Sequence, residues 1–156
     1  AKNNKEYIEN ILFSVQNADN IVELNEIEDE IDEFILLKPK KEKKKEKIQV
    51  QLIEYKGYKM LLGKNNKQND YIIRKLSNPE DIWLHAYNSP SSHLIIKQDE
   101  KTNEILLYAA KIVKENSPMK NSSKASIIYT KRKFLKRPPN TPNGYVTYRE
   151  EKEIVI

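Results

Sequence analysis

Cysteine is absent from this chain of 156 residues, which excludes a disulfide framework and any chemistry that depends on a thiolate. The absence fits a reducing compartment, and we expect a cytoplasmic location. No apolar run approaches the ~20 residues that span a bilayer, and the chain does not open with a charged and then apolar signal peptide. We therefore expect no membrane partner. Histidine occurs only twice, so a zinc site would need carboxylate ligands from elsewhere in the chain.

The charged residues, 33% of the chain, fall into blocks of opposite sign. Residues 1–37 hold two lysines and ten acidic residues, and residues 38–47 hold seven lysines and two glutamates. Residues 48–156 hold nineteen basic and eleven acidic residues, a net charge of +8. These blocks indicate an acidic arm over 1–37, a Lys-rich linker over 38–47 and a basic domain over 48–156. A basic domain attracts polyanions, of which nucleic acid is the commonest.

The acidic arm has the apolar spacing of two helices within 2–37. The first stripe consists of Ile8, Ile11, Leu12 and Val15, and the second, a heptad-like seam, consists of Leu24, Ile27, Ile31 and Phe34. Between the stripes, Asp19 or Asn20 could cap the second helix. Two short amphipathic helices cannot bury their stripes alone. We interpret them as the end of a longer coiled coil, and the alternative is a helical hairpin packed on the domain.

The pattern after residue 48 mixes strands and helices without a repeating strand–helix–strand period, which favours an α+β fold. The expected elements are, in order, a hairpin of 49–55 and 59–62 that turns at Lys56-Gly57, a helix over 66–76 capped by Asn65, strands over 81–86 and 93–97, a helix over 104–115, a strand over 126–135, and a final strand pair of 146–148 with 154–156.

A basic stretch between residues 120 and 137 holds seven cations and no acid: Lys120, Lys124, Lys131, Arg132, Lys133, Lys136 and Arg137. Because none of them has an acidic neighbour in sequence, we predict that the last five contact the RNA backbone, where cations release condensed counterions. The alternative is a solvated strand face. We expect the interleaved Tyr129 and Phe134 to lie in the core, although aromatic rings here could also stack on unpaired bases.

An amide-rich stretch follows Gly63, which could permit a turn with exposed backbone amides. Side chains that both donate and accept hydrogen bonds predict a second polar contact surface for RNA, made of Lys64, Asn65, Asn66, Gln68 and Asn69. An ordinary polar loop with a helix cap explains the same residues. The spacing of a phosphate-binding Walker loop is absent.

Asp81, His85 and His93 could suggest a metal or acid–base centre, since histidine is the usual general base near neutral pH. The inventory is thin, because ~13 Å of extended chain separates Asp81 from His85 and no third ligand is recognisable. We predict no catalytic residue, no metal and no cofactor here. Structural hydrogen bonding or RNA contact is the favoured role for His85 and His93. Trp83 is expected in the core.

These same segments resemble the NFACT-R domain, the C-terminal module of the NFACT family. The matching stretches are 63–70, 81–85, 92–93, 121–124, 129–130 with Lys133, and 144–148. The residues upstream of 48 resemble the returning arm of that family's coiled coil. Three stretches depart from the family pattern: Ser91 stands where Gly is usual, Ile128 stands where an acidic residue is common, and the turn over 137–144 differs.

The resemblance implies an RNA-binding module of a ribosome-associated quality-control factor. Its implied partners are tRNA, the large ribosomal subunit and nascent-chain–tRNA complexes, with support for template-free alanine tailing of stalled chains. The implied module is not itself an enzyme. Two other classes remain open. An adhesin that binds fibronectin is suggested by an older family name, and an RNA-processing enzyme is disfavoured by the few catalytic side chains.

Overall fold

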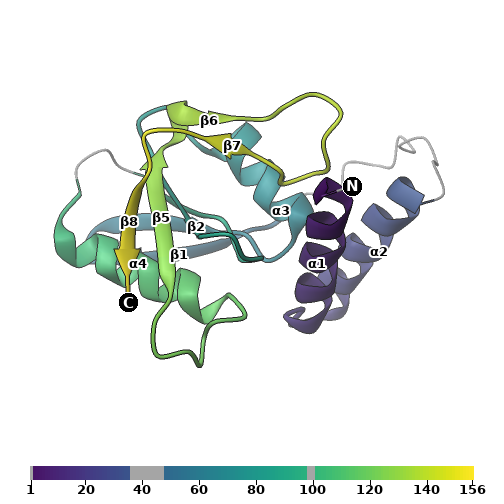
Figure 1. Cartoon of the computed structure of the whole chain (residues 1–156), viewed down its shortest axis with the longest axis horizontal. Helices are drawn as coiled ribbons and strands as arrows, with labels where there is room; N and C mark the ends of the chain where they lie inside the picture. The colour runs from purple at the N-terminus through teal and green to yellow at the C-terminus, as the bar shows by residue number, and fades with distance from the viewer. Residues whose placement is uncertain (1, 36–47, 98–100) are drawn as a thin grey trace.

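A six-stranded antiparallel sheet organises the chain in the computed structural model, which describes residues 2–35, 48–97 and 101–156 (Figure 1). The strand order is β1-β2-β4-β3-β5-β8, and β6 and β7 form a separate two-stranded sheet. The strands are β1 (Gln51–Tyr55), β2 (Tyr58–Leu62), β3 (Ile82–Ala86), β4 (Leu94–Ile96), β5 (Ser126–Lys131), β6 (Leu135–Lys136), β7 (Thr147–Tyr148) and β8 (Lys152–Val155). The helices are α1 (Lys2–Gln16), α2 (Ile21–Ile35), α3 (Asn66–Tyr71), the π-helical turn η1 (Ile72–Leu76), α4 (Asn103–Glu115) and the 3₁₀ turn η2 (Arg132–Phe134). The expected α+β class is confirmed.

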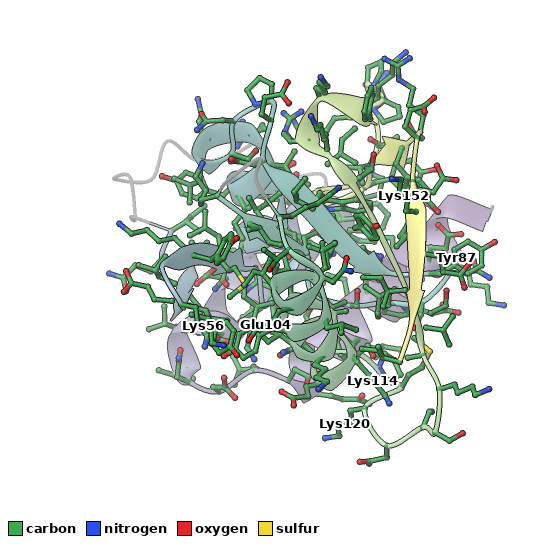
Figure 2. All side chains as sticks on the ribbon, turned by 90° about the vertical axis from the view of Figure 1, so that its left-hand side faces the viewer. Lys56, Tyr87, Glu104, Lys114, Lys120 and Lys152 are labelled. Atoms are coloured by element: carbon green, nitrogen blue, oxygen red, sulfur yellow. The ribbon has the colours of Figure 1, made fainter. Side chains whose placement is uncertain are left out.

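The β1–β2 hairpin turns where the sequence predicts. Lys56 has φ of 47° and Gly57 has φ of 83°, the two left-handed residues of a turn that matches strand twist. The Lys56 ammonium also pairs with the carboxylate of Glu104 at the start of α4, as the labelled side chains in Figure 2 show. The hairpin is thereby joined to the helix on its side of the sheet.

Alternating side chains of the central strands pack on the two faces of the sheet, as the pleat requires. Ile82, Leu84 and Ala86 of β3 face α4 and contribute to a core with Ile105, Ala109 and Val113 of that helix. Trp83 faces the opposite side, where Ile72, Ile73 and Leu135 cover it. His85 lies two residues after Trp83 and His93 lies two residues before Ile95, the pairing partner of Trp83, so both histidines belong to this second face.

The acidic arm forms two helices, and the expected break between them is confirmed. Asn20 caps α2, because its side-chain oxygen accepts a hydrogen bond from the Glu23 N–H at 3.0 Å. The helices share a small core of Tyr7, Ile11 and Ile27. Three residues of the first predicted stripe, Ile8, Leu12 and Val15, remain exposed.

The helix pair lies beside α3, at the end of the molecule away from α4 and β8 (Figure 1). Within the described ranges, it therefore packs on the domain as the hairpin alternative requires. The division into an arm over 1–37 and a domain over 48–156 stays a prediction, and the Lys run over 38–47 lies outside the described residues. None of the helices in those ranges is long and apolar enough to cross a bilayer.

Two expected elements are wrong in detail. The strand over 126–135 stops at Lys131, where the chain turns through η2 before the short β6. The segments 146–148 and 154–156 do not pair with each other, because β7 pairs with β6 and β8 pairs with β5. Alternation alone could not show this, since register and partner depend on the turn at 132–134.

Candidate nucleic-acid interface

The amide-rich stretch is buried, and its side chains bond within the protein. Asn65 caps α3 by accepting from the Gln68 N–H at 2.9 Å, as the sequence predicts. The Gln68 side-chain oxygen accepts from the Lys64 N–H at 3.0 Å, and Asn69 accepts from the His93 N–H at 3.2 Å. Asn66 is buried as well. Direct RNA contact by these amides stays a prediction, and it would require the helix pair to move away.

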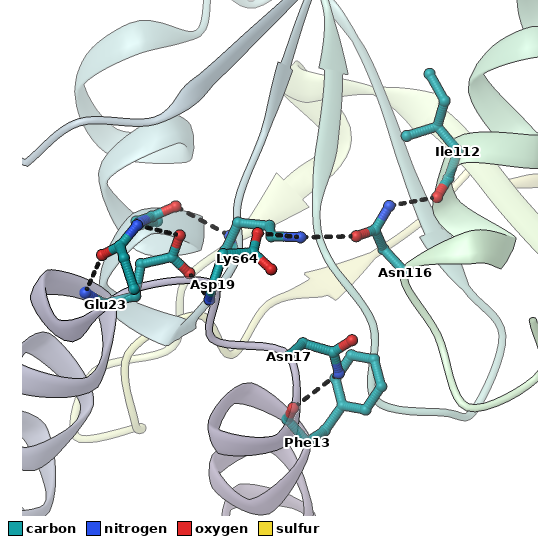
Figure 3. A network of polar contacts seen from close by, with 9 residues as sticks. Phe13, Asn17, Asp19, Glu23, Lys64, Ile112 and Asn116 are labelled. Atoms are coloured by element: carbon teal, nitrogen blue, oxygen red, sulfur yellow. Dashed lines mark hydrogen bonds and ion pairs between the residues drawn. The ribbon is translucent and has the colours of Figure 1, made fainter.

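The two lysines of this stretch face the acidic helix pair. Lys64 lies 3.5 Å from the carboxylate of Asp19 and also donates to Asn116 at 3.1 Å, so its side chain bridges the arm and the domain (Figure 3). Lys67 lies 3.9 Å from Glu33 of α2. The arm therefore pairs with Lys64, the one cation of this stretch that the sequence assigns to RNA, and with Lys67, which sequence reasoning did not assign.

A buried carboxylate lies under the arm, at Glu30 of α2. The Tyr7 hydroxyl donates to Glu30 Oε1 at 2.9 Å. Oε2 of Glu30 and Nδ2 of Asn66 each have no hydrogen-bond partner among the described residues. Burial raises the pKa of Glu30 to about 7, although the Tyr7 and Asn66 groups offset part of the effect. Burial likewise raises the pKa of Tyr7.

The two histidines meet beside the only tryptophan, on the face of the sheet opposite α4. The His85 and His93 rings stand edge to face with centroids 4.8 Å apart. The Trp83 ring lies nearly parallel to His85, at 5.7 Å, and edge on to His93, at 5.6 Å. The expected core position of Trp83 is confirmed, because 1% of its surface is exposed.

Hydrogen bonds fix the tautomers of both rings. His85 Nδ1 lies 2.7 Å from the Ala86 carbonyl, which can only accept, so Nδ1 carries the proton. Trp83 Nε1 donates to His93 Nδ1 at 3.2 Å, so the neutral His93 ring carries its proton on Nε2. Burial lowers the pKa of His85 to about 4 and that of His93 well below its usual value, so both rings are neutral at pH 7.

A cleft of about 590 Å³ opens over these rings. One wall is α1, the second is the β3–β4 loop, and the third is the segment from Gly144 to Tyr148. Tyr148, 36% exposed, lies 5.6 Å from Trp83. Sequence reasoning did not assign Tyr148 or the α1 wall to a site. The match of 144–148 to the family pattern was the one available signal for Tyr148, and there was none for α1.

Three cations of the basic stretch pair with acidic residues that are distant from them in sequence. Lys131 and Lys133 pair with Glu80 at 2.7 and 3.0 Å. Arg137 pairs with the buried Asp70.

The Arg132 guanidinium is directed inward, where its Nε donates to the Ile73 carbonyl and to Ser77, both at 3.1 Å. Glu80 and Asp70 are distant in sequence from the cations they pair with, so only the fold brings them together. Lys120, Lys124 and Lys136 are exposed and form no ion pair with a described residue.

The aromatic residues of that stretch differ from each other. Tyr129 packs against the core on the α4 side, as expected, and the Lys101 ammonium lies 4.9 Å from its ring centroid. Phe134 belongs to neither core of the sheet. It lies between the cationic groups of Lys133 and Arg149, at 5.5 and 5.2 Å.

Asp81 lies at the opposite end of β3 from the histidines. Its carboxylate pairs with Lys97 at 2.7 Å and accepts from the Asn78 N–H at 2.8 Å. In the parts of the chain that the structure describes, no three His, Cys, Asp or Glu side chains are grouped to hold a metal ion. Asp81 therefore serves a structural ion pair rather than a site with His85 and His93.

Ser91, which replaces the usual glycine, fits without strain. It is not among the described residues with positive φ. Its hydroxyl accepts from the Ala86 N–H at 3.0 Å and donates to the Ser92 carbonyl at 3.2 Å. The serine side chain therefore stabilises the β3–β4 loop beside the histidine pair through two hydrogen bonds.

Three comparisons show what the chain is similar to. The profile of the family described as NFACT protein RNA binding domain matches residues 44–150. The Rqc2 homolog RqcH of Bacillus subtilis is 32% identical over 97% of this chain, and that of Streptococcus suis is 29% identical over 96%. The Coiled-coil domain-containing protein 25 of Danio rerio is 28% identical over 61% of this chain and 49% of its own length.

A solved structure has the same fold. It is the C-terminal part of the fibronectin/fibrinogen-binding protein from Streptococcus suis, which superposes with a TM-score of 0.87 at 28% identity. The match covers 99% of this chain and 64% of that one. The two bacterial relatives are longer, since the chain spans 27% and 28% of their lengths.

Proposed function

We propose that this chain, which belongs to the NFACT RNA-binding domain family, acts as the RNA-binding module of a larger ribosome-associated quality-control factor. The observation that carries the proposal is the family match over residues 44–150, joined by similarity to RqcH proteins over nearly the whole chain. The proposed RNA is tRNA, large-subunit ribosomal RNA, or both. The proposed location is the cytoplasm, where these RNAs act.

In the full-length protein, the module would help to hold stalled large subunits with their nascent-chain–tRNA complexes while an alanine tail is added. The chain covers about a quarter of the length of its bacterial relatives, so the tailing activity belongs to the whole factor. The exposed lysines of the basic domain support the proposal, because phosphate contact supplies most sequence-independent RNA affinity.

We further propose that this module binds rather than catalyses and needs no cofactor. A general base works best when its pKa is near the working pH, and burial lowers the pKa of His85 to about 4. The hydrogen-bond partners of the two imidazoles are the Ala86 carbonyl and the Trp83 N–H, and among the described residues no carboxylate bonds to either ring as in a triad.

The experiment that tests the function is binding of the 156-residue chain to deacylated tRNA and to purified large ribosomal subunits over a salt series. We expect saturable binding that weakens as salt rises. A chain that binds neither RNA at low salt would refute the proposal. Copurification of the full-length protein with large subunits and tRNA extends the test to the cell.

A second candidate function rests on the name of the solved relative, which is a fibronectin/fibrinogen-binding protein. Immobilised fibronectin that retains the chain after ribonuclease treatment would favour an adhesin. Retention that ribonuclease abolishes would instead favour RNA as the ligand.

A further inference from the structure

The cleft between α1, the β3–β4 loop and the segment from Gly144 to Tyr148 has the size of a ligand site. Its volume of about 590 Å³ falls within the usual range for pockets that bury small ligands. Both histidines and the only tryptophan of the chain line it. The two rarest ring types of the chain, imidazole and indole, are therefore all found in this one cleft.

The floor of the cleft offers one hydrogen-bond acceptor and one donor. His85 uses Nδ1–H on the Ala86 carbonyl, and the Ser91 backbone also contacts this ring, so the neutral ring keeps Nε2 as its unprotonated, accepting nitrogen. His93 uses Nδ1 to accept from Trp83, which leaves Nε2–H as a donor. Adjacent donor and acceptor groups match the edge of a nucleobase, where an amine or carbonyl stands next to a ring nitrogen.

The aromatic groups supply flat surfaces for a planar ligand. Trp83 and His85 are parallel within 7°, and Tyr148 leans toward Trp83 at an interplanar angle of 37°. Trp83 is almost fully buried, whereas Tyr148 is exposed at the mouth of the cleft. A base that enters could therefore stack on Tyr148 while its edge reaches the two imidazoles.

The charges around the cleft favour a neutral ring over a phosphate. The floor holds two neutral imidazoles, and the α1 wall carries Lys5 against Glu6 and Glu9. The cations that could contact the RNA phosphates lie outside the cleft, on a neighbouring loop. Lys120 and Lys124 lie on the loop after α4, which bonds to the β3–β4 loop through Asn116 and Ser92 and through Ser126 and Tyr87. A strand could therefore place its backbone on this loop and one base in the cleft.

We propose that the cleft over His85 and His93 binds one unstacked nucleobase of single-stranded RNA, with Tyr148 as the stacking residue. This rests on the proposed RNA-binding function. A phosphate group offers no hydrogen-bond donor when fully ionised and no flat face, so it would not use the neutral donor–acceptor pair and the flat walls together.

The test uses the full 156-residue chain and a short single-stranded oligoadenylate, compared with the same oligonucleotide carrying one abasic ribose at its centre. Trp83 fluorescence and the two imidazole NMR signals report on the cleft directly, since the chain has one tryptophan and two histidines. We expect the intact RNA to quench Trp83 and shift both imidazole signals. Tyr148→Ala should weaken binding by about tenfold or more, the usual effect of losing one base–aromatic stack.

Two variants make the result specific. Tyr148→Phe keeps the ring and should retain wild-type affinity. Tyr87→Ala removes an exposed tyrosine that does not line the cleft, and it too should bind as wild type. RNA that binds without changing Trp83, or equal losses in Tyr148→Ala and Tyr87→Ala, would overturn the base site and leave the RNA-binding function standing. Failure of every variant and the wild type to bind any RNA would overturn the function itself.

Discussion

Gly63 is required for space rather than for backbone conformation. An added Cβ would come within 1.9 Å of Asn69 Oδ1, the atom that accepts from the buried His93 N–H. Any side chain at this position must therefore displace Asn69. The sequence suggested that this glycine permits a turn with exposed backbone amides, and the structure shows instead that the Asn69 side chain closely approaches it.

We predict that Gly63→Ala destabilises the chain by roughly 1–3 kcal/mol, because the His93 N–H would lose its partner inside the protein. Urea unfolding followed by circular dichroism measures the change. Gly57→Ala is not a neutral control, because φ there is positive. Asn69→Ala is the matched comparison, and it should lower the free energy of unfolding by a similar amount. In the double variant, Gly63→Ala should then add little further destabilisation, because the Asn69 side chain is already absent.

Glu30 predicts an unusual pH dependence of stability. Its pKa is about 7 in the folded chain against 4.5 for an ordinary glutamate, so the native state binds the proton more tightly. The stabilising contribution is complete below pH 4.5 and is lost as pH rises through 7. The loss amounts to roughly 2–3 kcal/mol by pH 8.

Glu30→Gln should therefore unfold at nearly the wild-type urea concentration at pH 5 and be more stable than wild type by roughly 2 kcal/mol at pH 8. The matched control is Glu28→Gln on the exposed side of the same helix, which should leave the wild-type difference between the two pH values unchanged. A Glu30→Gln variant that tracks the wild type at both pH values would contradict the assignment of a protonated carboxyl.

At the scale of elements, the helix pair and the sheet have separate cores. Tyr7, Ile11 and Ile27 form the small core of the arm. Both cores of the sheet consist of residues after 48. The two parts meet through polar contacts such as those of Lys64 with Asp19 and Asn65 with Glu26.

Residues 48–156 alone should therefore unfold cooperatively, with a reduced stability, when residues 1–37 are removed. Thermal and urea transitions that coincide by circular dichroism and Trp83 fluorescence would support this. A fragment without a cooperative transition would show that the arm is part of the core. The loss of stability should be greater at pH 5 than at pH 8, since Glu30 leaves with the arm.

Local signals predicted the elements well, and distant contacts limited the rest. The Asn65 cap, the Lys56-Gly57 turn and the break at Asn20 are each specified by neighbouring residues. The pairing of Arg137 with Asp70 depends instead on the turn at 132–134, which alternating apolar residues do not reveal.

The same limit applies to the amide-rich stretch. Its composition is as typical of a binding surface as of a hydrogen-bonded interior. The stretch is interior because the arm packs over it, and the local sequence does not reveal that packing. The histidine pair was singled out in sequence, but its partners at Tyr148 and α1 lie far along the chain.

At the scale of the whole molecule, the partners of the cations decide which of them respond to salt. We predict that Lys120→Gln with Lys124→Gln flattens the dependence of log affinity on log salt by one to two units, at about 0.7–0.9 per phosphate contact. Lys131→Gln with Lys133→Gln should flatten it less, because Glu80 already holds both ammonium groups. Filter binding of tRNA over a salt series measures both slopes. If the two double variants had equal salt slopes, the ion pairs of Lys131 and Lys133 with Glu80 would have to break on RNA binding without a cost in free energy.

The sheet ends in two outer strands, β1 and β8, that face no further described strand. Open strand edges are templates on which other chains can add and grow into fibrils. Here the outermost strands carry charge and polarity among their apolar residues: Gln51 and Glu54 on one side, Lys152 and Glu153 on the other. A second copy that tried to extend the sheet would bury unpaired charge. The charged residues on β1 and β8 therefore oppose edge-to-edge growth of this sheet into a larger one.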